Sequence, residues 1–293
     1  MSKIAVVDLS WVMHRYRYAF NNLSCVVDGK EIPTGHVYGA YKFVKDLELK
    51  GYNRIILAVD SKPTIRKEIL SSYKENRKKA DDSFETYNIQ KDLDNILKMC
   101  TSLEHVYYVK REGYEADDII ASFIKKANEN WDFYFRDDDI LQTKGTYNLM
   151  VQFDKDMSVG SLCDRTEHIQ KKYGLNLDYL PVIWKIIKGD AGDCIPIAVP
   201  RFPTKTILEI CNKYDFSDIP SFEEIISMLG NAEYTGKMKE TMSGLKDENS
   251  DVYKNLKLNY SLVCPLYLKD LGLVKFKCDS LSSVFSRYNI KMF

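Results

Sequence analysis

The stretch IAVVDLSWVMHRYRYAF, residues 4–20, opens with four apolar residues that end at an aspartate, Asp8. Three further short apolar runs follow along the chain: residues 54–59 (RIILAV), 105–109 (HVYYV) and 132–135 (DFYF). Longer stretches with a helical pattern separate them. Short apolar strands that alternate with helices predict an α/β domain with a mainly parallel central sheet flanked by helices.

Aspartates follow three of the four expected strands. Asp8 ends the first run, Asp60 ends the second, and the fourth is followed by three in a row, Asp137, Asp138 and Asp139. In open α/β sheets, ligands bind outside the carboxyl ends of the strands. A single aspartate there is as readily explained as a helix cap or a turn residue. Three strands ending in this way favour one shared site at the edge of the sheet.

Residues 115–127 (EADDIIASFIKKA) are expected to form an amphipathic helix. Its apolar stripe consists of Ile119, Ile120, Phe123 and Ile124. Its first turn holds three acids, Glu115, Asp117 and Asp118. The helix dipole favours acids at this end, but three of them repel one another unless cations neutralise the charge.

A further helix is expected over residues 179–188, and it ends at Gly189. The turn that follows carries two acids, Asp190 and Asp193, and a helical pattern resumes over residues 204–211. The composition changes near residues 174–181, which predicts a boundary between two domains. We expect an α/β domain over residues 1–178 and a mostly helical domain over residues 179–293 that contributes these two acids.

Nine carboxylates are therefore expected at one edge of the sheet: Asp8, Asp60, Glu115, Asp117, Asp118, Asp137, Asp139, Asp190 and Asp193. Packed together they would be costly without cations. Oxygen ligands with few histidines suit Mg²⁺ or Mn²⁺, and two such ions about 4 Å apart clamp the attacking and leaving oxygens of a phosphoryl displacement. Zinc is disfavoured, because the four histidines are scattered and none of the seven cysteines forms a CxxC pair.

A basic segment directly follows Asp60. Residues 62–79 contain seven cations against two acids, with Tyr73 among them; the cations are Lys62, Arg66, Lys67, Lys74, Arg77, Lys78 and Lys79. Lysine and arginine contact phosphates, and an aromatic ring stacks on a base. The alternative is a solvated helix face, which is the common role of a charge run. The position next to the expected metal site favours nucleic-acid binding.

The bulk composition is that of a globular protein, with 45% hydrophobic and 29% charged residues. The formal net charge is zero, which leaves a nucleic-acid partner open because local fields decide binding. The odd cysteine count favours reduced intracellular thiols, and no apolar run is long enough to span a bilayer. We expect a soluble, cytoplasmic, monomeric protein without a membrane partner.

Over roughly residues 3–210 the chain resembles the phage and bacterial 5′–3′ exonucleases of the flap-endonuclease superfamily. The matching segments are IAVVDLSWVMHRYRYAF (4–20), AVDSKPTIRKEILSSYKENR (58–77), GYEADDIIAS (113–122), RDDDILQ (136–142) and KGDAGDCIPIAVPRFPTKT (188–206). The resemblance implies a PIN-like fold with a C-terminal helix-three-turn-helix region. It also implies that the nine acids bind the metals.

The same resemblance assigns roles to the basic residues. Three of them, Arg66, Lys74 and Arg77, are implied near the scissile phosphate as catalytic cations. Lys62, Tyr73, Lys78 and Lys79 are expected to contact the nucleic acid. The chain departs from the family where a Gly-x-Gly hairpin holds duplex phosphates, because Arg201 and Pro203 stand there. Proline has no amide hydrogen to donate, so we expect Arg201 and Lys205 to contact the duplex as cations.

These features predict a structure-specific 5′ nuclease that hydrolyses phosphodiester bonds in flap, nicked or RNA-primed DNA with two or more Mg²⁺ or Mn²⁺ ions. The resemblance implies products with a 5′ phosphate and a 3′ hydroxyl. Two alternatives stay open: a metal-dependent phosphatase acting on small phosphate esters, and a DNA-junction binding protein that does not cut. The sequence also leaves open whether the 5′ strand is DNA or RNA in a hybrid, and whether the tail at residues 286–293 binds replication proteins.

Overall fold

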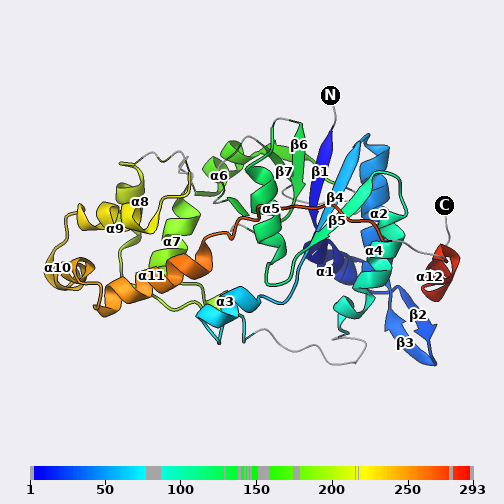
Figure 1. Ribbon diagram of the computed structural model, residues 1–293, viewed down its shortest axis with the longest axis horizontal. Helices are drawn as coiled ribbons and strands as arrows, with labels where there is room; N and C mark the ends of the chain where they lie inside the picture. Colours follow the sequence, from blue (N-terminus) through cyan, green and yellow to red (C-terminus); the bar gives the residue numbers. More distant parts are fainter. Residues whose placement is uncertain are drawn as a thin grey trace.

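A six-stranded sheet forms the centre of the α/β part of the protein, as the computed structural model shows (Figure 1). The structure describes residues 3–76, 87–128, 130–137, 140–141, 143, 145, 147–150, 159–173, 179–214, 216, 218–276 and 280–290. The strands of the sheet, in spatial order, are β5 (Val106–Lys110), β4 (Arg54–Val59), β1 (Ile4–Asp8), β6 (Trp131–Tyr134), β7 (Asn148–Met150) and β8 (Leu162–Asp164). Neighbouring strands are parallel except β7 and β8. The expected mainly parallel sheet is confirmed.

Helices cover both faces of this sheet, which explains why its strands are apolar on both sides. Ala5 and Val7 of β1 share a core with α1 (Leu9–Ala19), α2 (Gly35–Leu49) and α4 (Leu93–Thr101). Ile4 and Val6, which point the other way, share a core with α5 (Ala116–Ile124) and α6 (Arg165–Tyr173). The four residues of the expected stripe on α5 are all buried in this second core.

A second group of helices lies to the left of the sheet in Figure 1 and has its own hydrophobic core. Its members are α7 (Leu180–Lys188), α8 (Thr204–Cys211), α9 (Phe222–Gly230), α10 (Gly236–Ser243) and α11 (Asp251–Val263). Short 3₁₀ helices among the described residues include Ile89–Asp92, Ala191–Asp193 and Gly244–Lys246. The helix α3 (Thr64–Ile69) follows β4, and Tyr73 after it is buried in the core of the helical group.

After α11 the chain returns to the α/β part as an extended strap, residues 264–276 (Figure 1). Within the strap, Val274 pairs antiparallel with Tyr108 of β5 through backbone hydrogen bonds of 2.9 and 3.0 Å. The chain then forms α12 (Leu281–Arg287), whose Phe285 packs edge-on against Tyr41 of α2. The expectation that the chain is mostly helical after residue 179 therefore holds as far as Val263. The strap is held against the α/β part by Leu266 N–H donating to Asp118, by Leu268 N–H donating to Ser122, and by the single bridge of Val274 with β5.

A small hairpin, β2 (Ser24–Val27) and β3 (Lys30–Pro33), stands apart from the main sheet.

The structure places the carboxyl ends of β1, β4 and β6 side by side, with the helical group adjacent to them. In the described parts of the chain, no helix is long and apolar enough to cross a membrane.

Candidate metal centre and nucleic-acid interface

The aspartates that follow β1, β4 and β6 meet at the carboxyl edge of the sheet. Asp8 is the last residue of β1, and Asp60 directly follows β4, its parallel neighbour. Burial raises the pKa of Asp8 to about 7, and the nearby charges of Asp60 and Asp137 contribute to this rise. The Asp8 carboxylate also accepts a hydrogen bond from the backbone N–H of Trp11 (3.0 Å), so it caps α1.

Asp117, in the first turn of α5, completes this group. Burial raises its pKa well above the usual value, and Asp137, Asp8 and Asp60 add to the shift by charge repulsion. Asp60 fixes the position of α5, because its carboxylate accepts a hydrogen bond of 2.8 Å from the backbone N–H of Ala116. We call Asp8, Asp60, Asp117 and Asp137 the carboxylate cluster.

The carboxylate cluster has the donor chemistry of a site for hard divalent cations. Four mutually repelling carboxylates gain most from a bound cation, which favours their charged forms. Among the described residues, no three His, Cys, Asp or Glu side chains already lie at ligand spacing. Asp138 and Asp139 lie outside the described residues.

A second group of polar side chains lies beside the cluster and connects α5 to the helical group. The ammonium group of Lys74 binds the Glu115 carboxylate and lies 3.6 Å from Asp193. The Tyr73 hydroxyl donates to Glu115 (3.0 Å) and lies 3.4 Å from Asp193. Lys74 has a φ of 56°, a left-handed backbone conformation that is uncommon outside glycine. Such strained positions are concentrated at functional sites.

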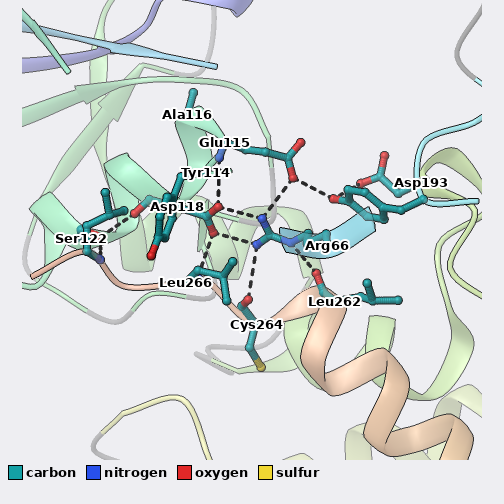
Figure 2. Close-up of polar contacts among 12 residues, drawn as sticks. Arg66, Tyr114, Glu115, Ala116, Asp118, Ser122, Asp193, Leu262, Cys264 and Leu266 are labelled. Atoms are coloured by element: carbon teal, nitrogen blue, oxygen red, sulfur yellow. Dashed lines mark hydrogen bonds and ion pairs between the residues drawn. The ribbon is translucent and has the colours of Figure 1, made fainter. Parts of the chain in front are cut away.

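Arg66 is buried, and Figure 2 shows its polar contacts. Its guanidinium binds both oxygens of Asp118 at 2.7 Å and Glu115 at 3.1 Å. It also donates to the backbone carbonyl oxygens of Leu262 (2.9 Å) and Cys264 (3.5 Å), where α11 ends. The expectation from the sequence placed Arg66 at the scissile phosphate. In the structure, the N–H groups of Arg66 donate to other residues of the protein instead.

Asp118 likewise has several protein partners. Besides Arg66, its carboxylate accepts hydrogen bonds from the backbone N–H groups of Glu115 (3.1 Å) and Leu266 (2.9 Å). The side chain is fully buried. Asp118 thus holds the first turn of α5, the end of α11 and the strap together. These contacts give Asp118 a structural role, and its expected metal role stays a prediction.

The turn between α7 and α8 carries the two remaining acids. Asp190 accepts hydrogen bonds from Lys185 (2.6 Å) and from the backbone N–H of Gly192 (2.8 Å). Burial pushes the pKa of Asp190 upward, but these bonds outweigh it and leave the pKa lowered. Gly189 is required here, because its φ is 69° and a Cβ atom would lie 2.4 Å from the carbonyl oxygen of Pro196. Asp193 is brought to Tyr73 and Lys74, whereas Asp190 is held by Lys185.

The cations expected to contact nucleic acid are more dispersed. Lys62 is exposed and follows Asp60. Arg201 and Lys205 are exposed at the start of α8, on the helical group. Arg77, Lys78 and Lys79 lie outside the described residues. The structure therefore places Lys62 beside the carboxylate cluster and the other two described cations on the neighbouring helical group.

Arg201 occupies a backbone conformation that glycine adopts more easily. Its φ is 59°, in the left-handed region. Pro203 follows in an extended conformation and precedes α8. The carbonyl oxygen of Phe202, between them, accepts a hydrogen bond from Lys188. The segment 201–203 thus has, at its first position, a backbone conformation that suits glycine, and it carries an exposed cation there.

Two positioning residues were not anticipated from the sequence. Lys185 binds Asp190, and Asn76 donates a hydrogen bond of 2.8 Å to the carbonyl oxygen of Ala191. Lys185 lies five positions before Asp190. A lysine one to two helical turns before the Gly-Asp turn is the signal in the sequence that could have identified it. Asn76 is 115 positions from Ala191, and nothing local in the sequence marks that pair.

Comparison with known proteins identifies the family. Residues 3–174 match the model of the 5′-3′ exonuclease N-terminal resolvase-like domain. The chain is 30% identical over 227 residues to a 5′-3′ exonuclease of Buchnera aphidicola, covering 72% of this chain and 70% of that one. It is 28% identical over 255 residues to DNA polymerase I of Bacillus subtilis, covering 84% of this chain but only 26% of the polymerase.

A solved structure supports the same fold. The T5 D15 protein, co-crystallised with metal ions, superposes with a TM-score of 0.57 and 17% identity, covering 88% of this chain and 89% of that one. At this identity the likeness concerns the fold. From the family match, together with the exonuclease relative, it follows that this chain belongs to the 5′-3′ exonuclease family.

Proposed function

We propose that the chain is a structure-specific 5′ nuclease that hydrolyses phosphodiester bonds in flap, nicked or RNA-primed DNA with two or more Mg²⁺ or Mn²⁺ ions. The observation that carries the proposal is the carboxylate cluster. Burial and mutual repulsion raise the pKa of Asp8 to about 7 and raise that of Asp117 well above its usual value. Such a cluster costs stability unless a cation or a proton compensates it. Its presence therefore favours a function for that site.

The residues have distinct parts in this proposal. Asp8, Asp60, Asp117 and Asp137 would hold the ions, which when bound activate the attacking water and stabilise the leaving 3′ oxygen. Lys74, whose ammonium group lies among Glu115 and Asp193, offsets negative charge that develops on the phosphate.

We also propose that the helical group, α7 to α11, holds the duplex. Arg201 and Lys205 are exposed at one end of α8, where their charges reach phosphates. The proposed division at residues 178 and 179 is supported by the separate hydrophobic core of this group. The strap and α12 pack on the α/β part, so the duplex-binding part is best confined to residues 179–263. We propose that the protein acts as a monomer in the cytoplasm.

The direct test is cleavage of a 5′-labelled flap oligonucleotide with and without Mg²⁺, followed on a denaturing gel. We expect magnesium-dependent cleavage by the wild type and its loss in Asp117→Asn. Asp94→Asn is the matched control, because Asp94 is an exposed acid at the equivalent second position of α4. Hydrolysis of a small chromogenic phosphate ester without flap cleavage would instead indicate a phosphatase. Binding of the flap without any cleavage would indicate a junction-binding protein.

A further inference from the structure

Asp137 differs from the other members of the carboxylate cluster in how its backbone is held. Asp8 is the last residue of β1, Asp60 directly follows β4, and Asp117 lies in the first turn of α5. Asp137 comes three residues after the end of β6, on the segment that leads to β7. Its place in the cluster therefore depends on what fixes this segment.

The segment turns directly after Asp137 and is anchored in a hydrophobic core. The carbonyl oxygen of Asp137 accepts a hydrogen bond of 3.4 Å from the N–H of Ile140, whose own carbonyl oxygen accepts one of 3.1 Å from Thr143. The side chains of Ile140 and Leu141 are buried in the core that lies under α5 and α6. The turn that begins at Asp137 is thus tied down within four positions, at Leu141.

Arg165, the first residue of α6, holds the backbone of this turn. Its Nε donates a hydrogen bond of 3.1 Å to the carbonyl oxygen of Leu141, and its Nη2 donates to the same oxygen. The backbone N–H of Arg165 donates to the carbonyl oxygen of Tyr147 (3.3 Å), directly before β7. Arg165 is the largest fully buried side chain among the described residues. Burying a guanidinium is costly unless it is hydrogen-bonded, and its bonds to Leu141 offset part of that cost.

The start of α6 gives Arg165 a fixed base. The Asp164 carboxylate caps the helix, because it accepts hydrogen bonds from the backbone N–H groups of Thr166 (2.8 Å) and Glu167 (3.3 Å). Asp164 is also the last residue of β8, which pairs with β7. The guanidinium is therefore carried by a helix end that is tied to the sheet, whereas the carbonyl that it holds lies on the segment between two strands.

The turn that Arg165 holds bears directly on the carboxylate cluster. After burial, the charge of Asp137 is the largest cause of the raised pKa of Asp117, ahead of the charges of Asp8 and Asp60. The interaction between two charges varies inversely with their distance. A displacement of the turn would therefore change how Asp137 and Asp117 face a shared cation.

We propose that Arg165 is a positioning residue for the metal centre, which sets Asp137 in the carboxylate cluster by holding the carbonyl oxygen of Leu141. The inference rests on the metal centre of the proposed nuclease function. In this role Arg165 acts through the backbone of the turn and binds neither the ions nor the phosphate. Loss of a residue that orients metal ligands from outside typically weakens metal affinity or activity about 10–100-fold. A residue that only packs α6 would change the stability and leave the metal affinity as it is.

The test compares two substitutions of Arg165. Arg165→Met removes every donor from an unbranched side chain, whereas Arg165→Lys keeps one ammonium group that can bind Leu141. Calorimetric titration of the DNA-free protein with Mn²⁺ gives the metal affinity, and flap cleavage gives the Mg²⁺ concentration at half the maximal rate. We expect Arg165→Met to weaken Mn²⁺ binding about tenfold and to raise the half-saturating Mg²⁺ concentration by a similar factor. The maximal rate should change less, and Arg165→Lys should recover part of the affinity.

The matched control is Tyr52→Phe, which disturbs buried polar contacts of the same strand away from the turn. The Tyr52 hydroxyl donates to Asp132 of β6 (2.5 Å) and lies 2.6 Å from the hydroxyl of Tyr134. Its loss should lower the Tm in EDTA, followed by far-UV circular dichroism, and leave the Mn²⁺ affinity at the wild-type value. If Arg165→Met does not fold, Arg165→Lys decides alone, and it should bind Mn²⁺ more weakly than both the wild type and Tyr52→Phe.

The outcomes separate the two proposals. Wild-type Mn²⁺ affinity and an unchanged half-saturating Mg²⁺ concentration in the folded Arg165 variants overturn the positioning role, while the nuclease function stands. A wild type that binds Mn²⁺ but cleaves no flap in Mg²⁺ overturns the nuclease function, and the Mn²⁺ titrations still decide the role of Arg165. A wild type that binds no Mn²⁺ overturns both.

Discussion

Arg66→Ala is expected to lower the stability of the protein by about 3–5 kcal/mol, the usual cost of removing one partner of a buried ion pair. Both partners are almost completely buried, with side-chain exposures of 5% for Arg66 and 0% for Asp118. Truncation leaves the Asp118 carboxylate with only its two backbone donors, from Glu115 and Leu266. If the chain unfolds in one step, this cost corresponds to a fall in Tm of about 5–8 °C.

Thermal unfolding in EDTA, followed by far-UV circular dichroism, measures this effect without metal. Lys67→Ala is the matched control: Lys67 is the next residue of α3, is exposed, and should change the stability by less than about 0.5 kcal/mol. Arg66→Lys keeps the charge but cannot bind both oxygens of Asp118 in the same planar arrangement, so it should fall between the two.

A double-mutant cycle with Asp118→Ala isolates the pair itself. The double variant should be more stable than the sum of the single losses predicts, because neither unpaired charge remains buried. A loss below about 1 kcal/mol in Arg66→Ala, or additive losses in the cycle, would refute the assignment of Arg66 as the residue that connects α3, α5 and the end of α11.

Further predictions concern the metal centre and its surroundings. Asp117→Asn should abolish cleavage. At a pH above the raised pKa of Asp117 it should also raise the Tm of the metal-free protein, because it then removes one of the repelling charges; a Tm at or below the wild-type value at that pH would contradict this. The pKa of Asp8 is raised from 3.8 to about 7, so the folded protein holds this proton more tightly than the unfolded chain. The free energy of unfolding of the metal-free protein should therefore fall as the pH rises from about 4 to 8. Mg²⁺ should restore stability at the upper end of this range. Tyr73→Phe removes the hydroxyl bonded to Glu115 and should cost about 1 kcal/mol, whereas Tyr18→Phe, at a 72% exposed site, should cost nothing measurable in the same unfolding assay. Arg201→Gly should relieve the strain of the left-handed backbone and raise the Tm. It should also weaken duplex binding and lower the slope of log affinity against log salt concentration by about 0.9. Unchanged binding would exclude Arg201 as a residue that binds phosphate.

The elements that sequence analysis predicted best are those with a strong local pattern. The helix expected over residues 204–211 is α8 with the same bounds, and the apolar runs became β1, β4, β5 and β6 within one or two residues. Short apolar strands between helices predict a mainly parallel sheet with little ambiguity, because few other folds bury such strands on both faces.

Some elements were missed although a local signal existed. The β2–β3 hairpin turns at Asp28 and Gly29, which have φ values of 52° and 76°. An Asp-Gly pair between two short runs is the usual signal for such a two-residue turn. The strands β7 and β8 have only three residues each, too few for a period to be recognised.

Other features could not be read from local sequence. Arg66 and Asp118 are 52 positions apart, and Leu266 lies another 148 positions beyond Asp118. The basic segment showed that Arg66 carries charge near the site, but only the fold decides whether that charge faces a phosphate or a buried carboxylate. The course of the strap could not be predicted for a similar reason, because its partners Asp118, Ser122 and Tyr108 are all distant in the sequence.

The central claim is that the carboxylate cluster binds divalent cations, and calorimetric titration of the DNA-free protein with Mn²⁺ tests it most directly. At about pH 7, the wild type should bind the ion with release of protons, because Asp8 and Asp117 hold protons until the cation displaces them. Asp117→Asn should weaken binding at least tenfold, while Asp94→Asn should bind like the wild type. Equal binding by the wild type and Asp117→Asn, or no binding by the wild type, would contradict the account.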